Sequence, residues 1–313
     1  MNNLNIWLRS TSYKEYELSI ASADASFRKY YRISKDKKSF IVMDSSLELK
    51  SLKPFLNVTS KLLNAGIKAP KIYEKNLKLG YLILEDFGDV NLLDVLNRDN
   101  FQTFYLNAIK NIIKIQNTKT SNLPIYDKKI LHFEMDLMSE WYLQKKLNFK
   151  PNDKDEELIS KSLNTISEVV LSQPQGIFVH RDFHSRNLML ISKDEIGIID
   201  YQDAMSGAIT YDLVSLLKDC YIEFDSQEIE KLALIFRDKK ELNVSDKEFI
   251  KWFDFTGLQR HIKVLGIFSR LAIRDKKESY IKDIPLVLKY VIDTAKKYDE
   301  TKELAQFLQG LNK

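Results

Sequence analysis

The segment 178–188 constrains the fold most strongly, because it carries His180, Arg181, Asp182 and Asn187 in the order H-R-D-x-x-x-x-N. The apolar residues before it predict a short strand that ends in a loop at Asp182. Asn187 stands five residues later, at the start of a second apolar run. A carboxylate and an amide placed in this way can converge on one site, so the pattern predicts a mixed α+β fold with a loop fixed between strands.

A second carboxylate follows thirteen residues after Asn187, at Asp200. The runs 188–191 (LMLI) and 196–199 (IGII) predict a buried hairpin that returns Asp200 to the level of Asn187. Mg²⁺ prefers a few carboxylate and amide oxygens together with phosphate oxygens. The pattern therefore points to phosphoryl transfer, with Asp182 as the base that orients or deprotonates a hydroxyl and with Asn187 and Asp200 as Mg²⁺ ligands.

The rest of the chain divides into a β-rich part and a helical part. Strands are predicted over 22–34 and 39–44 and around 72–73 and 81–84, with a helix over 52–65. The break at 85–88 (EDFG) predicts a hinge. Apolar residues at helical spacing then predict helices over 92–96, 101–116, 133–147, 158–171 and 252–273.

This organisation predicts an N-terminal lobe over 1–88 that covers a nucleotide and a catalytic, substrate-binding C-terminal lobe over 89–313. The net charge of +4 comes from scattered Lys residues, which argues against a nucleic-acid partner. The single Cys220 and the lack of a signal peptide or membrane-spanning run favour a cytoplasmic protein without a membrane partner. A monomer is one option that the sequence leaves open.

The motifs resemble those of the aminoglycoside phosphotransferase/choline kinase family, within the protein-kinase-like superfamily, over nearly the whole chain. More narrowly, SADASFRKYYRI, SFIVMD, HRDFHSRNLML and IGIIDYQDAMSGAITYDLVSLLKDCY look like segments of bacterial N-acetylmuramate/N-acetylglucosamine anomeric kinases. The resemblance implies the two-lobed protein-kinase-like fold and the use of ATP and Mg²⁺. It also implies phosphorylation of the anomeric hydroxyl of an amino sugar in cell-wall recycling.

On the nucleotide side, the resemblance implies that the segment from Ser22 to Arg28 covers the phosphates. This segment contains no Gly, so small residues such as Ser22 and Ser26 must supply the donors. Glu85 and Phe87 match the hinge at which an adenine ring receives main-chain hydrogen bonds. The segment 22–28 also fits an ordinary turn, and Glu85 and Phe87 also fit an ordinary linker.

A kinase usually carries a phosphate-binding Lys on its third strand, but this chain has Met43 in that strand. The missing cation can come from Arg28 or Arg32 on the preceding strand. Either guanidinium would suit bidentate phosphate contact.

On the acceptor side, the polar residues in or near the matching motifs predict sugar contacts, although each also fits a surface or helix-capping role. These residues are Arg186, Gln202, Asp203, Arg260 and His261. Two alternatives stay open: an aminoglycoside, choline or homoserine kinase of the same fold, and a pseudokinase that binds nucleotide without catalysis.

Overall fold

The computed structural model describes residues 2–22 and 28–311 and divides into two compact units. The first unit comprises residues 1–94 and 186–203, and the second comprises 95–185 and 204–313. The chain thus changes units after Asp94, again inside the H-R-D-x-x-x-x-N segment and a third time after Asp203, whereas the sequence predicted one change after Gly88. No helix in the described part of the chain is long and apolar enough to cross a membrane.

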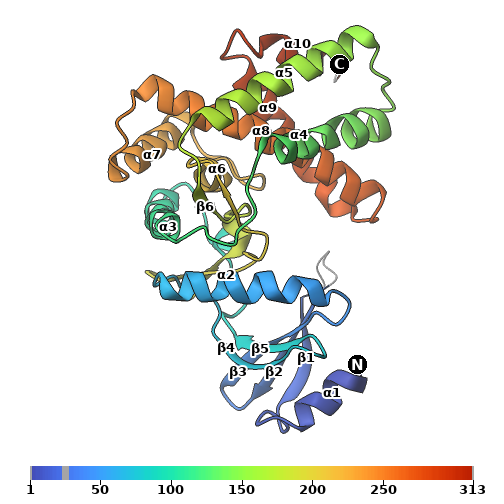
Figure 1. Ribbon diagram of the computed structural model, residues 1–313, viewed down its shortest axis with the longest axis vertical. Helices are drawn as coiled ribbons and strands as arrows, with labels where there is room; N and C mark the ends of the chain where they lie inside the picture. The colour runs from blue at the N-terminus through green and yellow to red at the C-terminus, as the bar shows by residue number, and fades with distance from the viewer. Residues whose placement is uncertain (1, 23–27, 312–313) are drawn as a thin grey trace. The chain divides into compact units, whose positions relative to one another are not determined.

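The first unit is built on a five-stranded antiparallel sheet in the order β1-β2-β3-β5-β4. Figure 1 shows α1 and α2 on opposite sides of this sheet. The elements of the unit are α1 (Asn2–Arg9), β1 (Glu17–Ser22), β2 (Lys29–Lys35), β3 (Lys38–Asp44), η1 (Leu49–Ser51), α2 (Leu52–Asn64), β4 (Ile72–Asn76), β5 (Tyr81–Glu85), η2 (Leu92–Asp94), β7 (Leu188–Leu190) and β8 (Ile196–Ile198).

The predicted hairpin near the amino end is confirmed, because β2 and β3 pair from Lys29↔Asp44 to Lys35↔Lys38. Alternation along β2 buries Tyr31 and Ile33 against α1. The predictions of α2 and of the two strands that became β4 and β5 are also confirmed. Helix α1 and strand β1 were not predicted, and the region 92–96 forms only a single 3₁₀ turn, η2, instead of the predicted helix.

The second unit is helical apart from one short strand pair, β6 with β9. Its elements are α3 (Phe101–Gln116), α4 (Lys128–Leu137), the π-helix η3 (Met138–Lys146), α5 (Asp153–Ser172), β6 (Ile177–Val179), β9 (Met205–Gly207), α6 (Tyr211–Leu217), α7 (Ser226–Lys239), α8 (Asp246–Ile273), η5 (Glu278–Asp283), α9 (Ile284–Ala295) and α10 (Lys302–Gly310). The 3₁₀ turn η4 (Ser185–Asn187) spans the point at which the chain passes from the second unit to the first.

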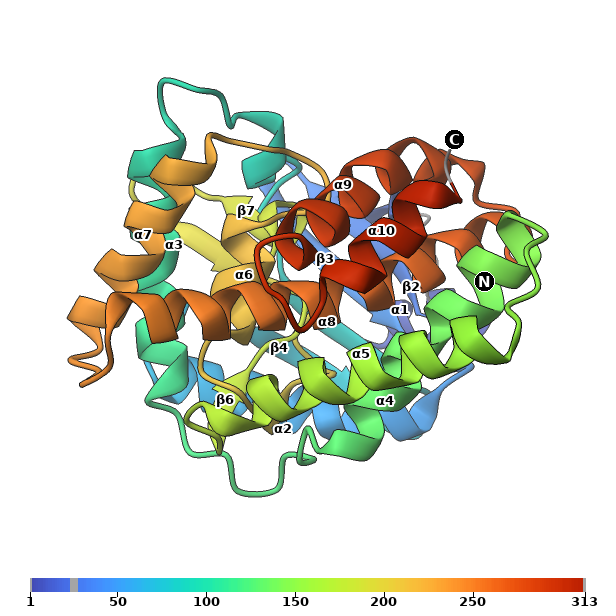
Figure 2. The same ribbon diagram turned by 90° about the horizontal axis from the view of Figure 1, so that it is seen from above.

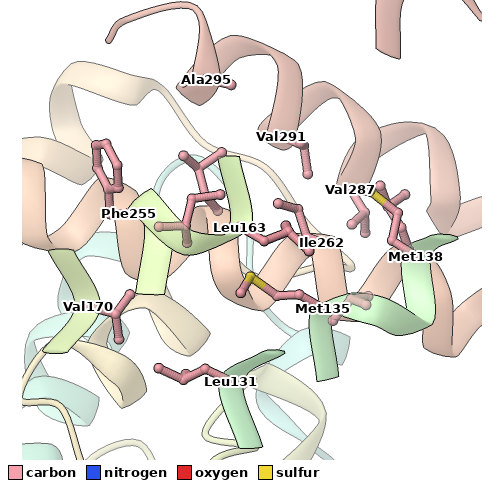
Figure 3. Packing of buried hydrophobic residues seen from close by; sticks show 14 of the residues in the cluster. Leu131, Met135, Met138, Leu163, Val170, Phe255, Ile262, Val287, Val291 and Ala295 are labelled. Carbon is pink, nitrogen blue, oxygen red and sulfur yellow. The ribbon is translucent and has the colours of Figure 1, made fainter. Parts of the chain in front are cut away.

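Helix α8 is the centre of the second unit, and Figure 2 shows it among α4, α5 and α9. Its residues are buried almost continuously from Phe253 to Gly266. Figure 3 shows Ile262 of α8 packed between Met135 of α4 and Val291 of α9. A helix that is buried on most of its faces lies in the interior of its unit, and the other helices of the unit pack around α8.

Candidate active site

The loop that carries Asp182 belongs to the second unit and begins where β6 ends at Val179. Asp212, in the first turn of α6, accepts the backbone N–H groups of His180 at 2.7 Å and of Arg181 at 3.0 Å. Asp212 thus ties the start of α6 to the loop. Asp182 in turn donates its backbone N–H to Nδ1 of the buried His180 at 3.3 Å, so His180 braces the loop from inside.

Asp182 presents its carboxylate at the edge of a group of cations. Its side chain is 40% exposed, and Oδ1 lies 3.6 Å from the buried guanidinium of Arg260. Burial alone would raise the pKa of the Asp182 carboxyl, but Lys263 and Arg260 outweigh it and hold that pKa well below its usual range. Asp182 is therefore ionised at neutral pH and available to orient a hydroxyl group.

Behind the loop lies a buried polar cluster, which we call the Glu134 cluster and define as Tyr126, Glu134, Arg181, Gln259 and Lys263. The carboxylate of Glu134 pairs with the Arg181 guanidinium and, at 3.1 Å, with Nζ of Lys263. It also accepts hydrogen bonds from the Tyr126 hydroxyl and from Nε2 of Gln259 at 3.2 Å. The cluster joins α4, α8 and the loop that carries Asp182.

The predicted hairpin that carries Asn187 and Asp200 belongs to the first unit and is confirmed. Strands β7 and β8 pair with Leu188 opposite Ile198, and Ile199 donates its N–H to the carbonyl of Asn187 at 3.1 Å. The next residue, Asp200, therefore comes level with Asn187. Nδ2 of Asn187 lies 3.4 Å from Oδ2 of Asp200.

The chemistry of the side chains around Asp200 suits Mg²⁺. The Asp200 carboxylate is exposed, and its other oxygen accepts from Nε2 of Gln202 at 2.9 Å. Gln202 also lies 3.3 Å from the Asp203 carboxylate. The described residues contain no group of three or more His, Cys, Asp or Glu that would form a closed metal cage. Mg²⁺ that binds with a nucleotide takes only a few oxygen ligands from the protein and takes others from the phosphates.

Arg28 occupies a buried position close to these residues in the first unit. Its side chain is only 6% exposed, and Nε donates to Oγ of Ser51 at 3.3 Å. Burial raises the pKa of Tyr30 to about 12, while Arg28 opposes this shift and Asp200 adds to it, so both charges lie near the Tyr30 ring. Met43 is completely buried on β3 and contributes no charge there.

Arg32, the second candidate cation, has a different environment. Its guanidinium contacts both oxygens of Asp86, at 2.6 and 3.1 Å, and also pairs with Asp89 at 2.8 Å. Burial would raise the pKa of Asp86, but the bonds from Arg32 and Ser39 lower it. Arg32 is thus engaged in a bidentate ion pair with carboxylates.

The other nucleotide-side residues are placed as follows. Glu85 ends β5, where its carboxylate pairs with Lys68 at 2.6 Å, and Phe87 lies against Gly197 of β8. Ser22 ends β1 in register with Tyr30. Ser26 lies outside the described residues.

On the acceptor side, Arg186 is half-buried in the first unit, and Arg260 lies next to Asp182 in the second. Arg260 also donates to the carbonyl of Arg181 at 3.0 Å. His261, the neighbour of Arg260 on α8, is completely buried, donates from Nε2 to the carbonyl of Lys218 at 2.9 Å and stacks on Tyr290. Its contacts are those of a core residue.

Sequence reasoning missed Glu134 and Lys263, which are both 5% exposed. A signal existed for each of them. Glu134 interrupts the apolar face of α4 between Leu131 and Met138, and Lys263 interrupts the apolar run of α8. A charged residue inside an apolar helix face is buried only with a partner, so the two together predict an internal ion pair.

The fold is shared with solved structures of small-molecule kinases. An aminoglycoside phosphotransferase in complex with gentamicin matches with a TM-score of 0.66 at 14% identity, covering 92% of this chain and 96% of that one. Choline kinase LicA from Streptococcus pneumoniae matches with a TM-score of 0.63 at 14% identity, covering 93% and 98%. By its fold the chain is thus a two-lobed, protein-kinase-like α+β protein.

The comparison with protein families is more specific than the comparison of folds. Residues 17–240 match the model of the phosphotransferase enzyme family, and the chain belongs to this family. It is 34% identical to the N-acetylmuramate/N-acetylglucosamine kinase of Neisseria meningitidis serogroup B, over 98% of this chain and 95% of that protein. It is also 34% identical to the protein of that name from Pseudomonas aeruginosa, over 94% and 88%. The chain is thus an enzyme, and its family implies ATP as phosphate donor and a small-molecule acceptor.

Proposed function

We propose that this enzyme phosphorylates the anomeric hydroxyl of N-acetylmuramate or N-acetylglucosamine with Mg²⁺-ATP. The observation that carries the proposal is the 34% identity, over nearly the full length, to a protein named as a kinase of these two sugars. The aminoglycoside and choline kinases are only 14% identical and support the fold alone.

Asp182 is the proposed base. Because its pKa lies below the usual range, the carboxylate mainly aligns the sugar hydroxyl and accepts its proton late, as the new bond to phosphorus forms. Asn187 and Asp200 are the proposed Mg²⁺ ligands. The ion would neutralise charge on the transferring phosphate.

Arg28 is the proposed substitute for the Lys that is absent at Met43. It is buried near Tyr30 and Asp200, whereas Arg32 is paired with Asp86 and Asp89. An arginine at this position would present two parallel N–H donors to phosphate oxygens.

Sugar recognition is assigned to polar residues of both units. Arg260 lies beside Asp182 in the second unit, and Arg186, Gln202 and Asp203 belong to the first. Hydroxyl and acetamido groups need several fixed donors and acceptors, and the lactyl carboxylate of N-acetylmuramate needs a cation, for which an Arg is suited. A soluble cytoplasmic monomer is the form in which we expect the enzyme to act.

The test is ADP release with Mg²⁺-ATP against N-acetylmuramate, N-acetylglucosamine, choline, homoserine and kanamycin. We expect turnover with the two amino sugars only, and a loss of about 10²–10⁴-fold in Asp182→Asn. Asp299→Asn, which removes an exposed carboxylate remote in sequence from the motif, is the matched control and should turn over normally. Turnover with another acceptor would refute the proposed substrate, and nucleotide binding without any turnover would favour a pseudokinase.

A further inference from the structure

Glu134 of the Glu134 cluster has no role in the scheme above, yet both of its carboxylate oxygens are used. Oε1 faces Arg181 and Lys263, and Oε2 faces Tyr126 and Gln259. Burial would raise the pKa of Glu134, but Lys263 and Arg181 outweigh it and lower that pKa. The carboxylate is therefore charged and is held from four directions.

Arg181, one of its partners, precedes Asp182 directly and is held in a strained backbone conformation. Its φ of +79° lies in the left-handed region, which residues other than Gly rarely adopt. The backbone is fixed from two sides, because its N–H donates to Asp212 at 3.0 Å and its carbonyl accepts from Arg260 at 3.0 Å. The guanidinium is fixed by Glu134 and lies over the Tyr126 ring, 5.5 Å from its centre.

A strained backbone conformation persists only when several surrounding contacts hold it in place. Asp212 and Arg260 hold the main chain of Arg181, and Glu134 is the anion that holds its side chain. Because the Cα atoms of consecutive residues are fixed about 3.8 Å apart, a shift of Arg181 is passed to Asp182.

We propose that Glu134 is a positioning residue of this enzyme, which sets the place of the Asp182 carboxylate by anchoring the side chain of Arg181. The inference rests on the proposed role of Asp182 as base. It assigns to α4, a helix outside the H-R-D-x-x-x-x-N segment, a direct part in the geometry of the reaction.

A merely structural alternative is that Glu134 only neutralises the buried cations Arg181 and Lys263. Removing one partner of a buried ion pair destabilises a protein because the other charge is left uncompensated. Loss of activity in Glu134→Gln would not by itself separate the two explanations. They differ in what happens when Arg181 is removed as well.

The experiment is a double-mutant cycle with Glu134→Gln and Arg181→Met in the full-length enzyme. If Glu134 acts through Arg181, each single variant should lose about 10²-fold in kcat, the loss associated with misplacing a reacting group by about 1 Å. The double variant should lose no more than either single one, while KM for ATP stays within about twofold. Losses that multiply to about 10⁴-fold, or a kcat that returns to normal when both charges are removed, would overturn the proposal.

A second measurement does not depend on turnover. Hydrogen exchange of the backbone amides in 178–184 should become at least about tenfold faster in Glu134→Gln, while the amides of α9 keep their wild-type rate. Unchanged exchange in 178–184 would overturn the positioning role even for an inactive protein. Absence of turnover in the wild type would instead count against the proposed function, so the two failures can be told apart.

Discussion

At the scale of single residues, the two carboxylates proposed for catalysis and metal binding are associated with left-handed backbone. Arg181, directly before Asp182, has a φ of +79°, and Asp200 itself has a φ of +63°. Each such conformation costs on the order of 1–3 kcal/mol in a residue other than Gly. Hydrogen bonds to Asp212 and from Arg260 hold the backbone of Arg181 there, and Asn187 and Gln202 contact the carboxylate of Asp200.

Arg28 and Arg32 offer a matched pair of variants. Arg28→Met should raise KM for ATP or lower kcat by about tenfold or more, because the phosphate loses a charge-assisted donor. Arg32→Met should leave both kinetic constants within about twofold and instead lower stability, since its partners are Asp86 and Asp89. Steady-state kinetics and thermal melts check both variants, and the reverse pattern would assign the phosphate to Arg32.

His261 makes stability depend on pH. Burial lowers its pKa to about 3, from an ordinary value near 6.5. Between these values the unfolded chain binds a proton that the folded chain does not, so the free energy of unfolding falls as pH falls, by about 1.4 kcal/mol per pH unit. Stability is unaffected by this group above pH 6.5.

We therefore expect the free energy of unfolding of His261→Gln to depend less steeply on pH than that of the wild type between pH 6.5 and 4. The difference between the two slopes should correspond to about one proton. Urea titrations at several pH values measure this slope. Equal slopes in the two proteins would show that His261 does not titrate in the expected range.

At the scale of elements, α8 depends on a close approach to the helix beside it. A Cβ atom at Gly266 would lie 2.3 Å from the carbonyl carbon of Leu137, where α4 gives way to the π-helix η3. A Cβ at Gly257, two and a half turns earlier, would meet Lys218 at 3.5 Å and Val214 at 3.8 Å, which are ordinary contacts.

This contrast gives two opposite expectations within one helix. Gly266→Ala should destabilise the protein by about 1–3 kcal/mol, because backbone atoms must move apart. Gly257→Ala should leave stability unchanged or raise it by about 0.5–1 kcal/mol, since Ala favours a helix over Gly. Denaturant unfolding measures both, and a loss in both variants would mean that α8 tolerates no side chain at either position.

At the scale of the whole molecule, the chain passes between its two compact units within the proposed catalytic motif. Asp182 belongs to the unit formed by 95–185 and 204–313, and Asn187 and Asp200 belong to the other. The buried core of the larger unit is built mainly from apolar side chains of α4, η3, α5, α8, α9 and α10, and the described residues contain no group of three or more His, Cys, Asp or Glu that could hold a metal ion.

Removal of Mg²⁺ should therefore abolish turnover without unfolding the enzyme. With excess EDTA and no nucleotide, the melting temperature should stay within about 1 °C of the untreated value, because a structural metal would contribute directly to folding. Addition of Mg²⁺-ATP should raise it by mass action. A large drop in EDTA alone would reveal a structural metal ion that the proposed site does not account for.

The sequence by itself determined the elements whose signals are local. The strand-like runs 22–34 and 39–44 predicted the hairpin that became β2 and β3, and helical spacing predicted α3 over the same residues that it occupies, 101–116. The runs on either side of 192–195 predicted the hairpin that brings Asn187 level with Asp200, since an antiparallel turn fixes its own register.

Only the tertiary structure decided which partners these elements acquire. Strand β6 pairs with β9, a segment of three residues more than twenty positions away, and Glu134 meets Arg181 and Lys263 from separate stretches of chain. The tertiary structure also gave different neighbours to Arg28 and Arg32, the two cations that the sequence offered for the phosphate. Contacts between residues distant in sequence depend on how all the helices and strands pack together, and no local pattern of side chains encodes them.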